Sequence, residues 1–390
     1  MRGHLVHRKG GWDCHGLPVE IEVQRELGIQ SKADIEEYGI AEFNARCREA
    51  VFSYLEDWNA MTERIGFWLD LDDAYRTLDP TYVESVWWAL KLIHERDLLY
   101  EGHKVVPYCP RCGTALSSHE VAQGYQDVVD PSVYVRFGVA EDGGPLQAGD
   151  ELIVWTTTPW TLVSNAAVAV DPELTYVRAK ASTLDAPAVV AEALVERVLG
   201  EGAEVLARFP GAALDGVRYE PPFPYIPARE YGERGHSVLL ADFVTADDGT
   251  GLVHTAIAFG EDDFRLGAQY GLTVVNPVRP DGTYDERIGP YAGRFVKDAD
   301  ADLVEDLRRR GRLLRSESYE HAYPHCWRCG TPLLYYAKPS WYIATSRLRD
   351  RLLAANGSVD WHPEHIKHGR FGDWLDNNVD WALSRERYWG

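Results

Sequence analysis

A run of three threonines is the first group of residues that could do chemistry. Thr156, Thr157 and Thr158 follow a strand-like segment at 153–155, and a proline that cannot donate a backbone hydrogen bond closes the run. These hydroxyls, with that of Thr161 in the next turn, could present hydrogen-bonding groups to a ligand without adding charge. Threonine is also common in ordinary strands, so the run alone does not establish a site.

A second candidate group lies further along the chain, in the segment GTGLVHTAIAFGEDDF. It contains His254 and then the acidic run Glu261, Asp262 and Asp263, so a hydrogen-bonding group and carboxylates follow one another at fixed offsets. The structural alternative is a histidine in a core strand and an acidic first turn of a helix that begins near Phe264. Each group taken singly leaves both interpretations open.

Two cysteine pairs form a repeated motif. Cys109 and Cys112 lie in CPRCGTAL, and Cys326 and Cys329 lie in CWRCGTPL. The two-residue spacer lets both thiolates of a pair bind one ion, and the following glycine permits a tight turn. A lone pair could be a redox centre, but two pairs supply the four sulfurs of a closed, structural Zn²⁺ site. One ion would then clamp the two ends of the segment between the motifs.

Length and composition restrict the class of protein. The chain has 390 residues, of which 45% are hydrophobic, and this predicts two or three domains. No run of 18 apolar residues occurs, so a membrane span is not expected. The N-terminal segment is basic but lacks the apolar centre of a secretory signal. We therefore expect a cytoplasmic protein without disulfides.

The net charge of −21 argues against a surface that coats nucleic acid generally. Any contact with RNA would use local basic patches. The candidates are Arg308, Arg309, Arg310, Arg312, Arg315, Lys367, His368, Arg370, Arg385 and Arg387. The first five could equally form the solvated face of a helix.

Hydrophobic periodicity predicts the elements that must hold these groups in place. Strands are expected at 132–139, 151–156, 175–179 and 237–240, with one helix at 187–199 between them. A helix should follow the turn at Gly16 and Pro18, one long helix should cover 41–66, and another should begin at Pro80. The segment YYAKPSWYIATS should form a strand and then turn into a helix. Two helical stripes should pack in a core: Val51, Leu55, Trp58, Met61 and Ile65, then Val83, Val86, Trp87, Leu90 and Ile93.

Together, WTTTPWTL and GTGLVHTAIAFGEDD resemble the editing domain of class I isoleucyl-tRNA synthetases. In the valyl and leucyl relatives, arginine usually replaces the third threonine, so the run of three favours the isoleucyl type. The segment GWDCHGLPVE, the two cysteine motifs and the closing segment WALSRERYWG match family segments in the same order. Glu386 stands where many members have glutamine.

The resemblance implies an α/β fold, in which an incomplete Rossmann-type nucleotide-binding domain is interrupted by an inserted β-rich, barrel-like editing domain. Residues 1–125 would form the first part of the catalytic domain with the first zinc knuckle. Residues 126–320 would form the editing domain. Residues 321–390 would hold the second knuckle and return to the catalytic domain.

The resemblance also implies an activity. The parent enzyme would be an isoleucine–tRNA ligase that attaches isoleucine to tRNA(Ile) and hydrolyses Val-tRNA(Ile), because a hydrophobic pocket discriminates poorly against valine. Asp263 would bind the α-ammonium of the misattached valine, and His254 would shape its pocket. Thr156–158 and Thr161 would position the terminal adenosine and an attacking water. Asp13, as a buried carboxylate, and Trp389 would contact the amino acid of the synthetic site.

ATP and Mg²⁺ belong to the full-length parent in this interpretation. The HIGH and KMSKS signatures that hold ATP in the family do not occur in the sequence, and neither does the anticodon-binding domain. We therefore expect this chain, a monomer, to edit but not to form aminoacyl-adenylate. Two alternatives stay open: a freestanding trans-editing hydrolase, and a non-catalytic, zinc-stabilised RNA-binding module. Deacylation of Val-tRNA would exclude the second.

Overall fold

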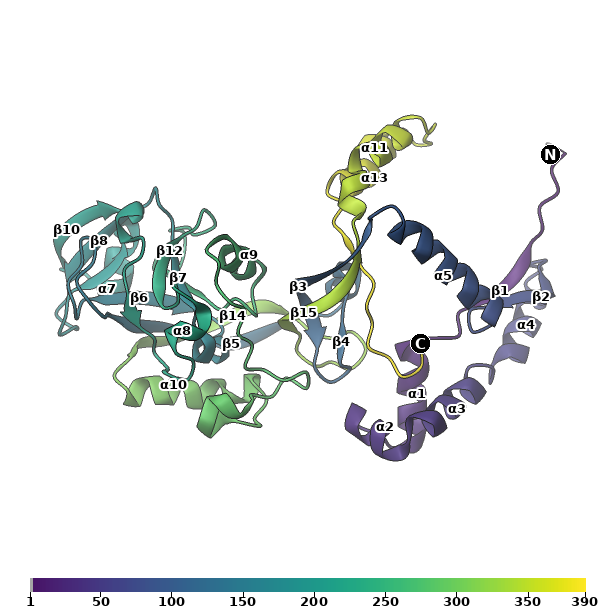
Figure 1. Cartoon of the computed structure of the whole chain (residues 1–390), viewed down its shortest axis with the longest axis horizontal. Helices are drawn as coiled ribbons and strands as arrows, with labels where there is room; N and C mark the ends of the chain where they lie inside the picture. Colours follow the sequence, from purple (N-terminus) through teal and green to yellow (C-terminus); the bar gives the residue numbers. More distant parts are fainter. Residues whose placement is uncertain (1–2) are drawn as a thin grey trace. The chain divides into compact units, whose positions relative to one another are not determined.

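The computed structural model describes residues 3–390, which form two compact units (Figure 1). Unit 1 comprises Met1–His103 and Pro339–Gly390, and unit 2 comprises Lys104–Lys338. Two strands, β3 (Leu99–Cys109) and β15 (Leu334–Ile343), carry the chain from one unit to the other. Unit 2 extends beyond the expected insertion at 126–320, because both cysteine motifs fold within it.

Unit 1 contains helices, a short 3₁₀ segment (η) and three short strands. They are β1 (Lys9–Trp12), α1 (Leu17–Leu27), α2 (Lys32–Tyr38), α3 (Ile40–Ala50), α4 (Leu55–Arg64), β2 (Asp70–Arg76), α5 (Pro80–His94), η6 (Thr345–Leu348), α11 (Arg349–Gly357), α12 (His365–His368), α13 (Arg370–Asp376) and β16 (Trp381–Ala382). β1 pairs in parallel with β2, and β16 pairs antiparallel with the end of β15. The helix after Gly16 and the strand and helix after the second cysteine motif are therefore confirmed. The Rossmann-type character of this unit stays a prediction.

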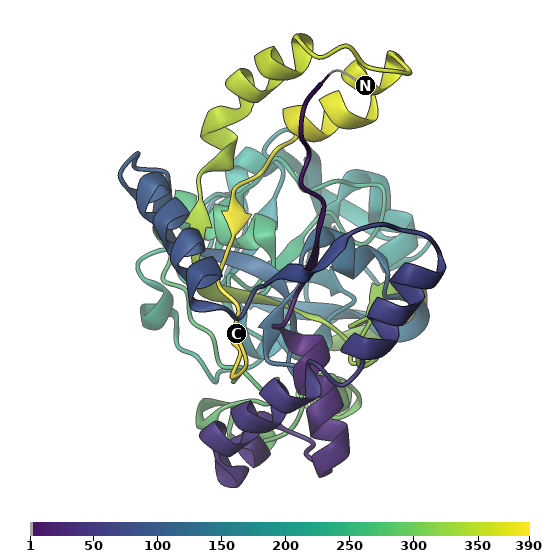
Figure 2. The same cartoon turned by 90° about the vertical axis from the view of Figure 1, so that its right-hand side faces the viewer.

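The small core of unit 1 joins segments from opposite ends of the sequence. Side chains of α1, α2 and α3 meet the indole of Trp389, and the core residues are Val23, Ile29, Ile35, Phe43, Cys47 and Trp389. Figures 1 and 2 both show the C-terminus beside α1. Ser31 caps the N-terminus of α2: its hydroxyl accepts a hydrogen bond from the amide of Asp34, and the Asp34 carboxylate accepts one from the amide of Ser31.

The single helix expected at 41–66 is two helices, so this prediction was wrong. α3 ends at Ala50, and α4 begins at Leu55 after a turn. Within the turn, the amide of Ser53 donates to the carbonyl of Ala50, and that of Leu55 donates to the carbonyl of Phe52. The residues of the turn include Val51 and two aromatic residues, which are weaker helix formers than the alanine-rich segment before them.

The apolar stripes of α4 and α5 are also not core, contrary to expectation. Trp58, Met61 and Trp87 are exposed, and no side chain of either helix is buried. A helical repeat of apolar residues shows which face could be buried, but burial requires another element to cover that face. Among residues 3–390 no element covers these faces.

Unit 2 is rich in strands. Besides parts of β3 and β15, it contains β4 (Thr114–Ala115), α6 (Ser118–Ala122), β5 (Tyr125–Val139), β6 (Glu151–Thr156), η1 (Pro159–Ser164), β7 (Ala167–Val170), β8 (Thr175–Lys180), β9 (Ala188–Ala191), η2 (Glu192–Leu194), α7 (Val195–Leu199), β10 (Glu204–Pro210), η3 (Gly211–Leu214), β11 (Tyr219–Glu220), α8 (Ala228–Tyr231), β12 (Ser237–Leu240), β13 (Val253–Thr255), α9 (Glu261–Gln269), η4 (Glu286–Tyr291), η5 (Lys297–Ala299), α10 (Asp300–Arg309) and β14 (Leu313–Pro324). The four strands expected from periodicity correspond to β5, β6, β8 and β12.

One curled sheet organises unit 2. Its strands follow the order β10-β8-β9-β6-β13-β7-β12, and β5 pairs with β6, β11 and β14. β5 and β14 form a long antiparallel ribbon, against which α10 packs (Figure 1). The fold is therefore mixed α/β with a sheet that curves part of the way toward a barrel.

The helix expected at 187–199 is only half correct. Residues 188–191 form β9, which pairs in parallel with β6 and antiparallel with β8, and only Val195–Leu199 are α-helical. The segment Ala-Val-Val-Ala suits a strand because its β-branched side chains are restricted in a helix. Pairing on both edges decides between the two structures, and sequence periodicity cannot reveal that pairing.

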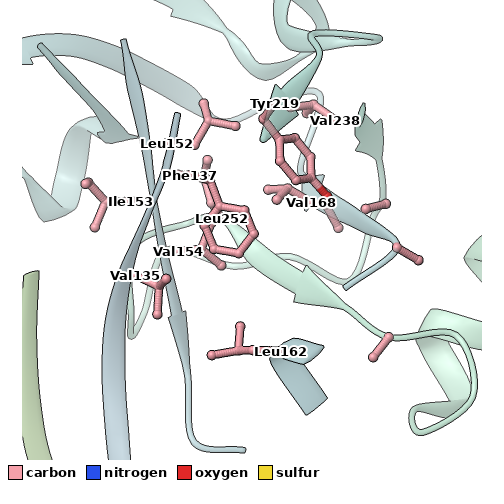
Figure 3. Close-up of a cluster of buried hydrophobic side chains, with 14 of the residues drawn as sticks. Val135, Phe137, Leu152, Ile153, Val154, Leu162, Val168, Tyr219, Val238 and Leu252 are labelled. Carbon is pink, nitrogen blue, oxygen red and sulfur yellow. The ribbon is translucent and has the colours of Figure 1, made fainter. Parts of the chain in front are cut away.

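The core of unit 2 lies on both faces of β6: Leu152, Ile153 and Val154 are all fully buried, and in Figure 3 Ile153 points to the opposite side from Leu152 and Val154. Phe137 of β5, Leu152 of β6 and Val168 of β7 are completely buried, and Figure 3 shows them with Tyr219 and Val238. Burying such a side chain contributes about 1.5–3 kcal/mol, so this core anchors the ends of the strands that carry the polar residues described below. Within residues 3–390 no helix is both long and apolar enough to cross a membrane.

Candidate functional site

The threonine run lies where β6 ends. β6 is held by its buried residues 152–154, and Pro159 then begins η1. The Oγ1 atoms of Thr156 and Thr158 are 3.2 Å apart, and those of Thr158 and Thr161 are 3.3 Å apart. Thr161 also donates to the carbonyl of Thr158 at 2.8 Å. Three of the four predicted threonines thus form a connected cluster of hydroxyls.

His254 reaches this cluster because β13 lies between β6 and β7 in the sheet. Val253 is opposite Trp155 of β6, and His254 is opposite Val168 of β7. The imidazole is buried, with Nε2 3.0 Å from Thr161 Oγ1 and Nδ1 2.9 Å from Asn165 Nδ2. His254 therefore lies beside the threonines because of a strand pairing that the sequence analysis did not predict.

The hydrogen bonds of His254 determine its protonation state. Tyr219 donates to Oδ1 of Asn165 at 2.6 Å, so the amide nitrogen of Asn165 faces Nδ1 of His254 and donates to it. Nε2 must then carry the proton and donate to Thr161. Burial lowers the pKa of His254 to about 3. His254 is consequently a neutral group with both nitrogens occupied, and it orients Thr161.

Asp263 lies in the first turn of α9. One of its carboxylate oxygens accepts a hydrogen bond from the amide of Ala256 at 3.0 Å. Burial, with a smaller contribution from the charge of Asp262, raises the pKa of Asp263 to about 7. Within residues 3–390 the Asp263 carboxylate forms no ion pair, so a cationic ligand group would stabilise its ionised form.

One pocket of about 330 Å³ joins these groups. Its lining residues are Tyr125, Thr156, Thr157, Thr158, Trp160, Thr161, His254, Ala256, Phe259, Asp263, His321, Ala322, Tyr323, Pro324 and Tyr335. The rings of Trp160 and Phe259 pack edge to face with centroids 4.9 Å apart and supply its apolar part. The structure thus brings all the predicted editing residues to one cavity.

A second wall of the pocket was missed by sequence reasoning. It comes from Tyr125 of β5, His321 and Tyr323 of β14 and Tyr335 of β15. The alternation of Tyr319, His321 and Tyr323 was an available signal, because residues two apart on a strand share a face. The contribution of β5 and β15 depends on tertiary pairing.

The four cysteines of the repeated motif lie together in unit 2. Their sulfur atoms are all within 4.8 Å of one another, with Cys329 Sγ 3.5 Å from Cys109 Sγ and 3.6 Å from Cys112 Sγ. These spacings are close to the separation of about 3.8 Å that follows from tetrahedral Zn–S bonds of about 2.3 Å. Hydrogen bonds among the four thiols lower the pKa of Cys326 and Cys329 and raise that of Cys109 and Cys112. The cluster can hold a metal ion.

Asp13 does not have the buried position that was expected. It is exposed on unit 1, where its carboxylate accepts a weak hydrogen bond of 3.4 Å from the amide of His15 in a local turn. The buried carboxylate nearby is Glu20, whose Oε1 accepts hydrogen bonds from the amides of Tyr388 and Trp389, each at 2.8 Å. Trp389 is buried, and its indole donates to the carbonyl of Cys14 at 2.7 Å.

The first candidate basic patch is largely neutralised within the chain. Each of its arginines pairs with a carboxylate, on Glu305, Asp306, Glu220 or Glu317. Exposed pairs of this kind add little stability but reduce the positive potential of a surface. The helical part of the run therefore fits the solvated-face alternative better than an RNA-binding patch.

Comparison with known proteins agrees with these features. The family model for class I tRNA synthetases (I, L, M and V) matches residues 1–390. The chain is 57% identical to the isoleucine–tRNA ligase of Streptomyces coelicolor and 52% identical to that of Thermus thermophilus. Both alignments cover 100% of this chain but only 37% and 36% of the relatives, so the chain spans little more than a third of their length.

A solved structure described as GlLeuRS-CP1 is 15% identical with a TM-score of 0.38, and the alignment covers 49% of this chain and 100% of that one. The sequence match over the whole chain is the decisive finding. This chain belongs to the class I tRNA synthetases of the isoleucine, leucine, methionine and valine group.

Proposed function

We propose that this chain is the editing portion of an isoleucine–tRNA ligase and that unit 2 hydrolyses Val-tRNA(Ile). The observation that carries the proposal is the convergence on one pocket of the hydroxyl cluster, neutral His254 and Asp263, which forms no ion pair among the described residues. The isoleucine–tRNA ligases that resemble the chain support the choice of tRNA(Ile). In the full-length enzyme, ATP, Mg²⁺ and a Rossmann-type domain to which unit 1 contributes would serve the attachment of isoleucine.

Each group has a distinct role in the proposed hydrolysis. Asp263 binds the α-ammonium of valine in a charge-assisted contact. Thr156 and Thr158 hold the terminal ribose and a water molecule, and His254 fixes Thr161 so that this arrangement is preorganised. The ester of an aminoacyl-tRNA is already activated, and water attacks it directly without a covalent enzyme intermediate.

Purified chain should deacylate Val-tRNA(Ile) faster than Ile-tRNA(Ile). The extra methylene of isoleucine would crowd the packed rings of Trp160 and Phe259, and such overpacking costs about 1–3 kcal/mol, or roughly 5- to 150-fold in kcat/KM. Release of radiolabelled amino acid measures both rates. Phe259→Ala should reduce the ratio by making room. Equal rates for the two substrates on the unaltered chain would contradict the size-exclusion role of this pocket.

Binding of the valyl group should weaken in acid. Because burial raises the pKa of Asp263 to about 7, its ionised fraction decreases as the pH falls through 7, while the ligand ammonium stays charged. Calorimetry with a non-hydrolysable, amide-linked valyl-adenosine should show affinity falling by nearly tenfold per pH unit below about 6. Asp263→Asn should abolish this dependence. An affinity of the unaltered chain that stays constant from pH 5 to 8 would exclude an ionised Asp263 as the ammonium ligand.

We also propose that Cys109, Cys112, Cys326 and Cys329 bind one structural Zn²⁺. The support is the donor set: four sulfurs close enough for a tetrahedral site and no position left for a reacting water. The ion would tie the ends of the unit that holds the pocket. It would take no part in hydrolysis.

A further inference from the structure

The pocket contains a second histidine that the proposed roles do not use. Among the described residues, His254 and His321 are the two histidines of the lining. Both nitrogens of His254 are engaged by protein groups, so it has no lone pair to offer a substrate. His321 makes a protein hydrogen bond through Nε2, and within residues 3–390 no hydrogen bond is formed by its Nδ1.

A carboxylate orients His321 from the neighbouring strand. Nε2 of His321 lies 3.2 Å from Oδ2 of Asp130 on β5, and the same oxygen accepts a hydrogen bond of 2.7 Å from Lys297 Nζ. Lys297 lies 3.8 Å from Asp300 and over the ring of Tyr323. The Lys297 and Asp130 side chains are only 13% and 14% exposed, so solvent competes little with this chain of contacts. Nε2 therefore carries the proton that it donates to Asp130, and Nδ1 has the lone pair.

The sheet brings His321 and the threonine run to the same pocket. β6 and β14 run in the same direction, because each is antiparallel to β5. Trp155 of β6 and Arg315 of β14 pair with the same residue of β5, Tyr134. Tyr319 lies four residues further along β14, and its ring still meets that of Trp155 edge to face, with centroids 5.8 Å apart. His321 lies two residues after Tyr319, beyond the level at which β6 ends, and it lines the pocket together with Thr157.

We propose that His321, positioned by Asp130, is the general base of the hydrolysis; this rests on the proposed editing function. Nδ1 takes a proton from the water as its oxygen attacks the carbonyl carbon of the ester. The bond between that carbon and the ribose oxygen then breaks, and the imidazolium returns the proton to the ribose oxygen. The products are valine and tRNA with a free terminal hydroxyl, and no other reactant is needed.

The test is steady-state deacylation of Val-tRNA(Ile) by the full chain and its variants. Glutamine at position 321 can still donate to Asp130 but cannot accept a proton. His321→Gln and His321→Ala should therefore both lower kcat by about 100- to 10,000-fold, the usual contribution of a general base. KM should change by less than about threefold, since substrate binding is kept. Added imidazole should restore part of the activity of His321→Ala.

The matched control is His119→Gln, which alters an exposed histidine of unit 2 outside the pocket and should leave kcat unchanged. His321→Gln with a kcat close to that of the unaltered chain would assign His321 a structural role and overturn the inference. So would a loss confined to KM, which would make His321 a binding residue. An unaltered chain without any deacylase activity would instead refute the proposed function itself.

Discussion

Asp263→Ala should slow deacylation of Val-tRNA(Ile) by roughly ten- to a hundredfold. The physical reason is the loss of a charge-assisted hydrogen bond to the substrate ammonium, worth about 1.5–3 kcal/mol. The threonines can orient water and ribose, but none of them can balance a positive charge. Asp263 is the carboxylate that lines the pocket, and burial raises its pKa to about 7, so the substrate cation would be its natural partner.

Two further variants make this prediction specific. Asp263→Asn keeps an acceptor for the amide of Ala256 and should show the same loss if charge is what matters. Asp262→Ala removes a neighbouring carboxylate that is exposed, pairs with Arg265 and does not line the pocket, so it should deacylate normally. Full activity in Asp263→Asn would mean that the carboxylate only holds the loop at Ala256.

Cys326→Ser should eliminate the metal ion and destabilise unit 2. We expect one zinc per unaltered chain by elemental analysis, and less than a tenth of that in the variant. Loss of an ion present at a thousandfold excess over its dissociation constant lowers the free energy of unfolding by about 4 kcal/mol. In thermal denaturation, the proposed editing pocket of the variant should unfold at a lower temperature than that of the unaltered chain. The reason is that β14 leads directly from the pocket wall into the second cysteine motif.

Cys47→Ser is the matched control for the loss of zinc predicted in Cys326→Ser. Cys47 is a buried thiol in the core of unit 1, outside the four-sulfur cluster, and burial raises its pKa to about 12. The variant should retain one zinc per chain. A stoichiometry of one zinc in Cys326→Ser, or an unaltered chain that stays metal-free in excess zinc, would contradict the shared site.

Local sequence was sufficient where the chemistry is local. The repeated cysteine motif predicted four clustered sulfurs, because each pair needs only its own tight turn and the repeat implies a shared ion. The strand ending at Thr156 was also predictable, since its β-branched and aromatic residues are followed by a proline that cannot continue the ladder.

Sequence failed where a neighbouring element decides the outcome. Residues 188–191 were predicted to be helical but form β9, because β6 and β8 supply hydrogen bonds on both of its edges. The apolar faces of α4 and α5 were predicted to pack in a core but are exposed, because no described element covers them. Asp13 was expected to be buried, yet the chain buries Glu20 instead, beneath the returning amides of Tyr388 and Trp389.

The sequence by itself therefore identified the threonines, His254, Asp263 and the cysteines as residues whose side chains could bind a ligand or a metal ion. Only the tertiary structure made the first three groups one site, because β13 inserts between β6 and β7 and puts His254 beside Thr161. The same is true of His321, whose carboxylate partner is far away in sequence and meets it only through the antiparallel pairing of β5 and β14. Residue types set what each group can do, and strand pairing sets which groups can act together.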